Sequence, residues 1–507
     1  MKLLKSWLCD WVDLGNISGD DLSDALESLG FEIENRTDIK ANYKNIVVGK
    51  VLEIYPHPNA DKVRITKVDT GNNIFEIVCG AWNFDVGAIV PVALPKSEIK
   101  DGFLIDKRDI RGIESNGMIC SASELDLWED NAGILLLSDN IKPGTDFFTI
   151  CPVNDIVWEI GVTPNRGDCM SHLGIARELS HYFKKPLLEN AIQLKPTIEN
   201  ILTLSSGKIN ECNNYAGIEI ENITITDSSF DIRYRLSQVG TRIINNVVDY
   251  TNYVLYDIGQ PLHAFDRDKL FGEISVRFAH QNEKLLTLDN QERELSIDDL
   301  IITADEKPIA IAGVMGGLYS EVTEETTNLL IESAYFDKVS IMNTSRKLNL
   351  ISDASIRFER GIDHKLQLFG INRFINIFEK DHIVSYSTPV ADSKQELVPS
   401  KVNFKLNEIY KLLGIRLENE FIQEMLEYLG IQFKLSDTEI SFQSPSWRYD
   451  LERPVDLIEE LAKHYGFNNF ESTLPIGTNK NKVGEYWKLK KKLTNHFISM
   501  NMYETRS

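Results

Sequence analysis

The chain of 507 residues lacks paired cysteines, long apolar runs and an excess of positive charge. No run approaches the ~18 apolar residues of a membrane span, and Asp10 and Asp13 interrupt the stretch that a signal peptide would need. We therefore expect a cytoplasmic protein without membrane contact. The scattered cysteines form no C-x-x-C pair, which argues against a disulfide framework or a thiolate zinc site and predicts reduced, structural thiols. They are Cys9, Cys79, Cys120, Cys151, Cys169 and Cys212.

Basic residues are scarce: 54 Lys and Arg stand against 76 Asp and Glu, for a formal charge of −22. A protein that binds nucleic acid mainly through phosphates carries a basic surface, so we expect no DNA partner and only a local nucleic-acid contact. The phosphate-binding pattern G-x-x-x-x-G-K-[ST], the zinc pattern H-E-x-x-H and a nucleophile elbow are all missing. Hydrophobic residues at 42% still predict an ordinary globular protein, and the length predicts several domains.

A local pattern recurs near the two ends of the chain. Residues 20–33 have apolar positions at helical spacing, and Gly30 follows where a left-handed helix end is favoured, before a short strand. The segment ALESLGFEI (25–33) aligns with MLEYLGIQF (425–433), and YKLLGIRL (410–417) is a partial third copy. Such helix-stop chemistry is common, so the match indicates similar local structure and leaves open whether a duplication lies behind it.

The segment YPHPNADK (55–62) lies among short alternating strands that predict a small β-barrel or sandwich between residues 45 and 95. On chemistry alone it is a turn. The segment also resembles the marker of the tRNA-binding OB domain found in several synthetases and tRNA-binding factors, and loops of such barrels bind nucleic acids. The resemblance implies tRNA binding. With so acidic a chain, we expect few phosphate contacts, near Lys62 and Arg64, and a modest salt dependence.

Further motifs follow one another along the chain and carry a second resemblance. They are GVTPNRGDCM (161–170), NNVVDYTNYVLYDIGQPLHAFD (245–266), IAGVMGG (311–317), ESAYFD (332–337) and RFERGID (357–363). In order and spacing, the chain closely resembles the β subunit of bacterial phenylalanine–tRNA ligase. The link to phenylalanine comes from this resemblance and not from composition or periodicity.

The residues themselves leave the chemistry of the middle region open. His263 follows a Gly-Gln-Pro turn, and a glycine-rich loop at 313–317 can approach a ligand closely, but a lone histidine is more often a half-buried structural side chain. The resemblance implies an editing module that hydrolyses tyrosine wrongly esterified to the phenylalanine tRNA. Its pocket would be lined by Thr251, Asn252, His263, Gly316, Glu332, Ser352 and Ala354.

The physical demand on such a pocket is clear, because phenylalanine and tyrosine differ by one hydroxyl. An apolar pocket rejects the extra hydroxyl only ~10²-fold, whereas a site that hydrogen-bonds the hydroxyl can prefer tyrosine over phenylalanine by ~10⁴-fold or more. We expect Glu332 to read the hydroxyl and His263 to position the ester or the attacking water. Whether His263 is a general base, or the terminal ribose hydroxyl of the tRNA does that work, stays open.

A cluster of acids marks the segment SWRYDLERPVDLIEELAKHYGF (446–467), in which Pro454 suits the first turn of a helix and Gly466 its end. Acids at a helix start can simply complement the dipole, and Glu459 can pair with Lys463. Alternatively, carboxylates without His or Cys favour Mg²⁺. The resemblance implies Mg²⁺ at Asp450, Asp456, Glu459 and Glu460. The motif more usually reads Arg-Pro-Asp, so Tyr449 is a departure expected to alter only the local turn.

The resemblance implies a partner and an assembly. An α subunit would hold the ATP and phenylalanine site, two α and two β chains would assemble, and tRNA(Phe) would be bound. Family β chains continue into a class II synthetase-like domain and an anticodon-binding domain, which we expect to be essentially absent here, as in a fragment or truncated chain. The alternatives are a stand-alone tRNA-binding or trans-editing protein without a synthetase partner, and an RNA-binding scaffold with an inert pocket.

We accordingly predict a multidomain α+β fold, with an OB-type barrel inserted in an N-terminal α/β domain. Its predicted parts are a split N-terminal α+β domain (1–39 with 152–195), the OB-fold tRNA-binding domain (40–151), the α+β editing module (200–395), a small helical, winged-helix-like metal-binding domain (400–475) and the start of a truncated class II synthetase-like domain (476–507).

Overall fold

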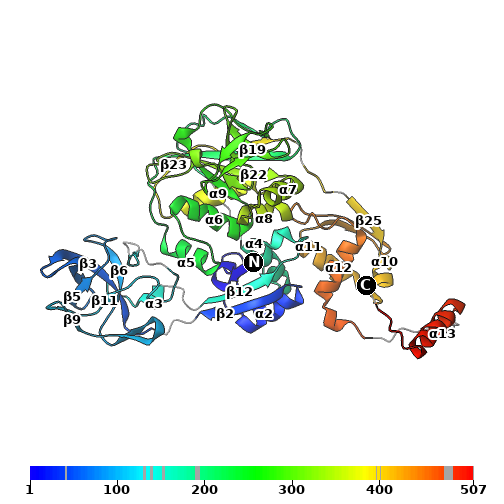
Figure 1. Cartoon of the computed structure of the whole chain (residues 1–507), viewed down its shortest axis with the longest axis horizontal. Helices are drawn as coiled ribbons and strands as arrows, with labels where there is room; N and C mark the ends of the chain where they lie inside the picture. Colours follow the sequence, from blue (N-terminus) through cyan, green and yellow to red (C-terminus); the bar gives the residue numbers. More distant parts are fainter. Residues whose placement is uncertain are drawn as a thin grey trace. The chain divides into compact units, whose positions relative to one another are not determined.

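The computed structural model describes residues 1–39, 43–129, 133–137, 141–150, 155–188, 194–394, 397–399, 401–472 and 484–505. It divides into two compact units, residues 1–465 and 466–507 (Figure 1). The mixed α+β character predicted from the sequence is confirmed. Several predicted features lie outside the described residues: Cys151, and the domain boundaries placed at residues 40, 151, 152, 395, 400, 475 and 476.

The N-terminal segment forms an antiparallel three-stranded sheet in the order β1-β12-β2, in which residues 155–161 pair with the first 39 residues. The predicted helix is present: Ser18 caps it by accepting from the Asp21 amide, and Gly30 follows with φ +87°. A glycine suits this left-handed position because it has no Cβ. The elements are β1 (Lys2–Leu4), α1 (Lys5–Leu8), α2 (Gly19–Ser28), β2 (Glu32–Ile39), β12 (Asp155–Gly161), η2 (Gly167–Cys169) and α4 (His172–Tyr182).

Residues 46–119 form a five-stranded antiparallel sheet in the order β11-β6-β3-β4-β5, with two small hairpins. The predicted alternating strands are confirmed here, and the turn of YPHPNADK joins β3 to β4, where His57 pairs with Ala60. Closure of this sheet as an OB barrel stays a prediction. The elements are β3 (Ile46–His57), β4 (Ala60–Asp69), β5 (Ile74–Cys79), β6 (Ile89–Ala93), β7 (Ser97–Ile99), η1 (Lys100–Gly102), β8 (Phe103–Ile105), β9 (Arg108–Ile110), β10 (Ile113–Ser115), β11 (Met118–Ile119) and α3 (Phe147–Ile150).

The middle of the chain contains two further sheets. One has the order β13-β16-β19-β20-β21, and the other has the order β15-β22-β14-β23 with β24 also paired to β14. The strands are β13 (Leu204–Ser205), β14 (Cys212–Glu221), β15 (Leu262–Asp266), β16 (Ile274–Phe278), β17 (Lys284–Leu286), β18 (Glu292–Glu294), β19 (Leu300–Ala304), β20 (Lys307–Ile311), β21 (Met315–Gly316), β22 (Leu329–Phe336), β23 (Ser385–Tyr386) and β24 (Val390–Ser393). The helices are α5 (Phe230–Gln238), α6 (Asn246–Ile258), η3 (Arg267–Lys269), η4 (Leu318–Ser320), α7 (Lys338–Leu348), α8 (Asp353–Arg360) and α9 (Gln367–Phe378).

Strand β22 separates two hydrophobic cores, because alternate side chains of a strand point to opposite faces. Leu329 and Ile331 belong to the core that includes residues of α6 and α9. Leu330 and Phe336 belong to the core formed with β16, β19 and β20. Glu332 lies two residues after Leu330 and is therefore on the same face of β22, the face that points into the space between the two sheets.

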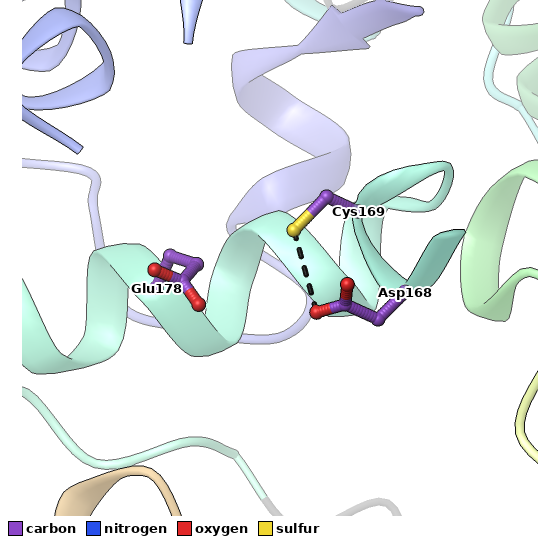
Figure 2. A group of neighbouring side chains, drawn as sticks. All are labelled: Asp168, Cys169 and Glu178. Atoms are coloured by element: carbon purple, nitrogen blue, oxygen red, sulfur yellow. Dashed lines mark hydrogen bonds between the residues drawn. The ribbon is translucent and has the colours of Figure 1, made fainter. Parts of the chain in front are cut away.

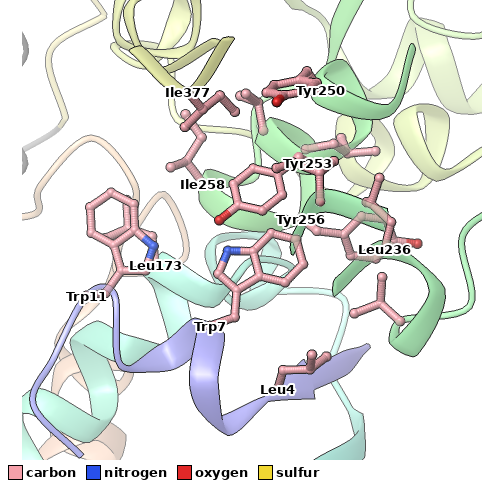
Figure 3. Close-up of a cluster of buried hydrophobic side chains, with 14 of the residues drawn as sticks. Leu4, Trp7, Trp11, Leu173, Leu236, Tyr250, Tyr253, Tyr256, Ile258 and Ile377 are labelled. Carbon is pink, nitrogen blue, oxygen red and sulfur yellow. The ribbon is translucent and has the colours of Figure 1, made fainter. Parts of the chain in front are cut away.

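The core on the helix side also joins the N-terminal segment to the middle of the chain (Figure 3). The buried Asp257 at the end of α6 accepts hydrogen bonds from the indole N–H groups of Trp7 and Trp11 at 2.9 and 2.7 Å. Its other oxygen accepts from Arg373 on α9 at 2.7 Å. Each donor of this buried carboxylate comes from a segment far away in sequence, so residues 1–12 are part of the central fold.

Residues 401–465 form a small unit with the strand order β25-β27-β26 and packed helices. Helix α11 is followed by Gly430, with φ +65°, and then by β26, as α2 is followed by Gly30 and β2. The similarity seen in the sequence therefore extends to a helix, a left-handed glycine and the strand order of a whole sheet. The winged-helix description stays a prediction. The elements are β25 (Lys401–Lys405), α10 (Asn407–Leu413), α11 (Asn419–Tyr428), β26 (Gln432–Leu435), β27 (Glu439–Gln443) and α12 (Pro454–Tyr465).

The second unit contains η5 (Phe467–Asn469) and α13 (Glu485–Ser499). Five cysteines of the described part are free, in agreement with the predicted reduced thiols. Within the described residues, every helix is too short or too polar to traverse a bilayer.

Candidate functional site

His263 and Glu332 face each other across two neighbouring strands. In the antiparallel pair β15·β22 they are directly opposite partners, so their side chains lie on the same face of the sheet. His263 is held edge-on to the ring of Phe265, with 4.5 Å between the ring centroids. The sheet register thus places an imidazole and a carboxyl side by side, between the two sheets of the middle region.

Both side chains line one cavity of about 80 Å³. Its apolar walls include Ile302 and Ile311 from the other sheet, and Phe336 and Phe358 from the core. Gly316 and Ala354, two of the residues implied by the resemblance, line the same cavity. The structure therefore brings His263, Gly316, Glu332 and Ala354 together around one space.

Gly316 lies against the imidazole of His263. A Cβ added at this glycine would lie 2.6 Å from Cε1 and 2.7 Å from Nε2 of His263. Side chains do not approach so closely, so only glycine allows the 315–316 strand and the histidine to occupy their present positions. This close approach explains why the motif IAGVMGG has a glycine at position 316.

Glu332 is 6% exposed, and within the described residues no hydrogen bond or ion pair engages its carboxyl. Burial raises its pKa from 4.5 to about 8, because an uncompensated charge is disfavoured away from water. At pH 7 the carboxyl is therefore largely protonated. It can donate one hydrogen bond and accept another, which suits a hydroxyl-bearing ligand.

Burial acts in the opposite direction on His263 and lowers its pKa to about 4, because here the charged form is the protonated one. The imidazole is neutral at pH 7, with one nitrogen that donates and one that accepts. Among the described residues, no hydrogen bond engages either nitrogen. A half-buried, neutral imidazole next to a protonated carboxyl can orient a polar group or a water molecule.

The remaining implied pocket residues have other surroundings. Thr251 is buried on α6 and donates to the carbonyl of Val248, and Asn252 follows it. Neither lies among the residues that line the cavity. Ser352 caps α8 by accepting from Ser355, and it donates to the carbonyl of Val314, so it ties the helix carrying Ala354 to the glycine loop.

A buried network of charges lies outside this cavity, and in it Lys463 pairs with Glu460 and Glu178 instead of the Glu459 suggested by the helical spacing. Arg166 donates to Asp168 at 3.0 and 2.9 Å and to Glu178 at 2.7 Å. The corresponding bonds of Arg448 go to Asp450, at 2.8 and 2.9 Å, and to Glu460, at 2.8 Å. The signal was present in the sequence, because both segments have Arg, then Asp two positions later, then Glu ten positions after that.

The two halves of the network meet at Lys463. Its ammonium lies 2.7 Å from Glu460 and 3.2 Å from Glu178, and the neighbouring His464 lies 3.7 and 3.8 Å from the same two carboxylates. Glu178, Glu460 and His464 could hold a metal by spacing alone. Lys463 already supplies the cation at these oxygens, so the cluster is an internal ion-pair network.

Asp168, Cys169 and Glu178 form a second group with metal-ligand spacing (Figure 2). The thiol of Cys169 donates to Asp168, as the dashed line shows, and the Arg166 guanidinium contacts all three side chains. Burial raises the pKa of this thiol well above its usual range, so the thiolate that binds metals is disfavoured. The Arg166 guanidinium therefore already supplies the positive charge at this group, as Lys463 does at the other group.

The four carboxylates expected to bind Mg²⁺ do not form one ligand set. Asp450 and Glu460 share Arg448, whereas Asp456 binds Arg453 and two backbone amides, and Glu459 is exposed. Among the described residues, neither group with metal-ligand spacing contains Asp450, Asp456 or Glu459. Since Mg²⁺ requires a near-octahedral shell of oxygens, these residues do not fit the ion as they are arranged here. Mg²⁺ stays a prediction from the resemblance.

Tyr449, the departure from the usual motif, joins three segments. Its hydroxyl accepts from the amide of Gly167 at 3.2 Å and donates to the carbonyl of Arg360. A Cβ on Gly167 would lie 2.7 Å from this hydroxyl, and one on Gly361 would lie 2.8 Å from the ring. The effect of Tyr449 therefore reaches beyond the local turn that was expected to change.

Two residues near the predicted tRNA-binding loop have structural roles. The imidazole of His57 accepts from the amide of Asn59, and its other nitrogen lies 3.0 Å from the carbonyl of Ile110. Arg64 is buried, donates to the carbonyls of Ala81 and Phe84, and stacks on Trp82. Arg64 is thus not placed for a phosphate contact, whereas Lys62 is exposed.

Three family models match separate parts of the chain. A putative tRNA binding domain matches residues 46–146, a B3/4 domain matches residues 211–381, and a tRNA synthetase B5 domain matches residues 402–467. The cavity with His263 and Glu332 lies within the B3/4 range, and the Arg448 half of the charge network lies within the B5 range.

Curated relatives match nearly the whole chain. The phenylalanine–tRNA ligase beta subunit of Photorhabdus laumondii is 38% identical over 92% of this chain and 60% of its own length. Those of Syntrophus aciditrophicus and Carboxydothermus hydrogenoformans are each 36% identical, over 94% and 99% of this chain and 60% and 64% of their own length. A solved N-terminal fragment of the beta subunit from Pyrococcus horikoshii matches with a TM-score of 0.33 and 16% identity, over 62% of this chain and 88% of that one.

The chain spans about 60% of the length of the first of these relatives. The order of the matched domains is the order expected from the sequence motifs, and the relatives agree in name and coverage. The chain belongs to the family of phenylalanine–tRNA ligase β subunits.

Proposed function

We propose that the chain acts as the β subunit of a cytoplasmic phenylalanine–tRNA ligase, which binds tRNA(Phe) and supports charging by a separate α subunit. That subunit would hold ATP and phenylalanine, in an assembly of two α and two β chains. We further propose that the cavity at His263 and Glu332 hydrolyses tyrosine from mischarged tRNA. Support comes from the family membership and from the match of residues 46–146 to a tRNA binding domain.

One observation carries the hydrolytic part of this proposal: the Glu332 carboxyl and the His263 imidazole line one cavity, and among the described residues neither has a hydrogen-bond partner. Polar groups that line a cavity without a protein partner bond either water or a ligand. A ligand with a hydroxyl and an ester supplies partners for both groups. This is what a phenolic aminoacyl ester contains.

Discrimination against phenylalanine follows from the same geometry. The protonated Glu332 exchanges hydrogen bonds with a phenolic hydroxyl, whereas a phenyl ring would leave the buried carboxyl unpaired. A site built to bond a hydroxyl rejects the analogue without it by ~10⁴-fold or more. Correctly charged tRNA is therefore spared.

The reaction is an ester hydrolysis. The oxygen of a water molecule bonds to the ester carbonyl carbon, the bond from that carbon to the ribose oxygen breaks, and a proton passes to the ribose oxygen. The products are tyrosine and free tRNA. His263, with a pKa near 4, is a weak proton acceptor at pH 7, so its role is to position the water by a hydrogen bond.

Deacylation by the full chain tests this proposal. The wild-type chain should release tyrosine from tyrosyl-tRNA, and His263→Ala should lower the rate by about 10²-fold, within the range for a group that positions a reactant. His280→Ala, a histidine of the same region outside the cavity lining, is the matched control and should retain the wild-type rate. An equal rate for wild type and His263→Ala would remove the assignment.

The assembly is tested separately by native mass spectrometry of the complex isolated from cells. A ligase subunit brings an α chain with it, in equal numbers of the two chains. Recovery of the chain alone, together with hydrolysis of tyrosyl-tRNA, would instead identify a stand-alone editing protein.

A further inference from the structure

A second cleft, of about 380 Å³, is lined by residues of helices α3, α5, α6 and α9. Its volume lies within the range of ~300–1,000 Å³ that is typical of sites for small molecules, and such sites often lie where separate parts of a fold meet. Among the described residues, none lines both this cleft and the cavity at His263. The cleft is therefore a separate place at which a ligand can bind.

Apolar side chains from three helices line part of the cleft: Phe147 of α3, Phe230 of α5 and Ile377 of α9. The rings of Phe147 and Phe230 pack edge to face, with 6.2 Å between their centroids. Nearby on α5, the Arg233 guanidinium donates to the carbonyl of Leu136 at 3.1 Å. These contacts hold α5 in place beside α3, so the apolar wall is a built surface that an apolar group of a ligand can cover.

Charged side chains of both signs line the rest of the cleft. They are the carboxylates Asp10, Asp231 and Asp381 and the cations Arg235, Arg373 and Lys380. Because the two signs are equally represented, the cleft does not concentrate ions of one sign. A ligand that itself carries both signs suits it better than a simple anion or cation.

Four of these six groups already have partners within the protein. Arg235 donates to Asp10, and Asp381 accepts from the hydroxyl of Tyr250. Arg373 donates to the buried carboxylate at the end of α6. Their charges are therefore engaged in holding the fold together.

The other two groups, Asp231 and Lys380, are exposed, and among the described residues neither has a hydrogen bond or an ion pair. They nevertheless act on each other. Partial loss of water raises the pKa of Asp231, whereas the charges of Arg235 and Lys380 lower it. A free carboxylate and a free ammonium thus face one cleft without meeting, and a ligand that carries the complementary pair of charges can bind both.

We propose that this cleft binds a free α-amino acid with an apolar side chain, whose ammonium pairs with Asp231 and whose carboxylate pairs with Lys380. The side chain of the ligand lies against the apolar wall of Phe147, Phe230 and Ile377. An amino acid within a peptide lacks both charges and is not a ligand of this kind. This binding site is independent of the proposed hydrolysis, because the cleft shares no lining residue with the cavity among the described residues.

Isothermal titration calorimetry of the full chain tests the proposal, with L-phenylalanine, 2-phenylethylamine and 3-phenylpropanoate as probes. The three share one phenyl group, but the second lacks the carboxylate and the third lacks the ammonium. L-Phenylalanine should bind at least about tenfold more tightly than either analogue, because hydrogen bonds between charged partners are the strong ones. Equal affinities of the three probes, or no binding of L-phenylalanine, would overturn the proposal.

Two variants assign the binding to this cleft. Asp231→Asn should weaken binding of L-phenylalanine by about tenfold and leave that of 3-phenylpropanoate unchanged, and Lys380→Met should weaken L-phenylalanine equally and leave 2-phenylethylamine unchanged. The matched controls, Asp24→Asn and Lys307→Met, change exposed residues outside the cleft lining and should keep the wild-type affinities. Wild-type affinity for L-phenylalanine in both cleft variants would overturn the site. Equal thermal unfolding midpoints of all four variants show that a lost affinity does not come from misfolding.

Discussion

Arg166 and Arg448 occupy equivalent positions in two copies of one local structure. Each guanidinium binds an aspartate two positions later and a glutamate on the following helix, and the two glutamates, Glu178 and Glu460, share Lys463. The arginines also approach each other's glutamate, at 4.0 and 3.9 Å. The interface between residues 155–188 and residues 401–465 is therefore a symmetric set of buried ion pairs.

Removing one partner of this network should strongly destabilise the protein. Arg448→Met removes the cation that pairs with the buried Asp450 and leaves Glu460 with Lys463 and the more distant Arg166, and breaking a buried pair in this way costs about 3–5 kcal/mol. Urea unfolding of the full chain measures the loss. Arg453→Ala is the control, because Arg453 is 73% exposed where it pairs with Asp456, so its removal should leave the urea midpoint nearly unchanged. Equal effects of the two substitutions would contradict this account.

The ends of several helices could be predicted from the sequence, because the signals for helix ends are local. Gly30 and Gly466 marked helix ends, and Pro454 marked a helix start, as the structure has them. The contact between Arg448 and Glu178 could not be predicted, because it depends on how residues 401–465 pack against residues 155–188. The acids of 450–460 were expected to bind a cation, and the missing information was that arginines and a lysine already satisfy most of them.

The hydroxyl of Tyr449 should stabilise the junction of three segments. Tyr449→Phe removes an acceptor for Gly167 and a donor to Arg360, and leaving these backbone groups unpaired costs about 1–3 kcal/mol. Tyr410→Phe is the matched control because Tyr410 is 45% exposed. Thermal unfolding of both variants measures the difference. A Tyr449→Phe midpoint equal to that of Tyr410→Phe would show that the hydroxyl contributes nothing.

Gly316→Ala should abolish hydrolysis of tyrosyl-tRNA while the chain stays folded. The added Cβ would meet His263 at 2.6 Å and Leu288 at 3.0 Å, so the imidazole must leave its position beside Glu332. Gly15→Ala, whose Cβ would meet only Asp13 at 3.7 Å, serves as the control. Deacylation assays and circular dichroism of both variants provide the measurement. Full activity in Gly316→Ala would contradict the proposed position of His263.

Glu332→Gln should stabilise the protein increasingly as the pH rises. The folded protein holds the Glu332 proton up to a pKa of about 8, whereas the unfolded chain releases it near 4.5. Wild-type stability therefore falls between these pH values relative to the glutamine variant, by about 1.4 kcal/mol per unit of pKa shift, and the difference is constant above pH 8. Urea unfolding of both proteins from pH 5 to pH 9 measures it. A difference that does not change with pH would refute the raised pKa.

The site could be predicted only in part from the sequence, and for a physical reason. The family resemblance implied His263, Gly316, Glu332 and Ala354, which the fold gathers around one cavity. Their proximity depends on the register of β15 against β22, which no local pattern specifies. Thr251 and Asn252 were named with them, but α6 does not contribute them to the cavity lining.

The central claim is that Glu332 reads the phenolic hydroxyl. The ratio of kcat/KM for tyrosyl-tRNA to that for phenylalanyl-tRNA tests it most directly, measured for the wild-type chain and for Glu332→Ala. The account predicts a ratio of ~10⁴ or more for the wild type, and a fall of at least about 10²-fold in the variant, because the apolar pocket that remains cannot hydrogen-bond a hydroxyl. An unchanged ratio in Glu332→Ala would contradict the account.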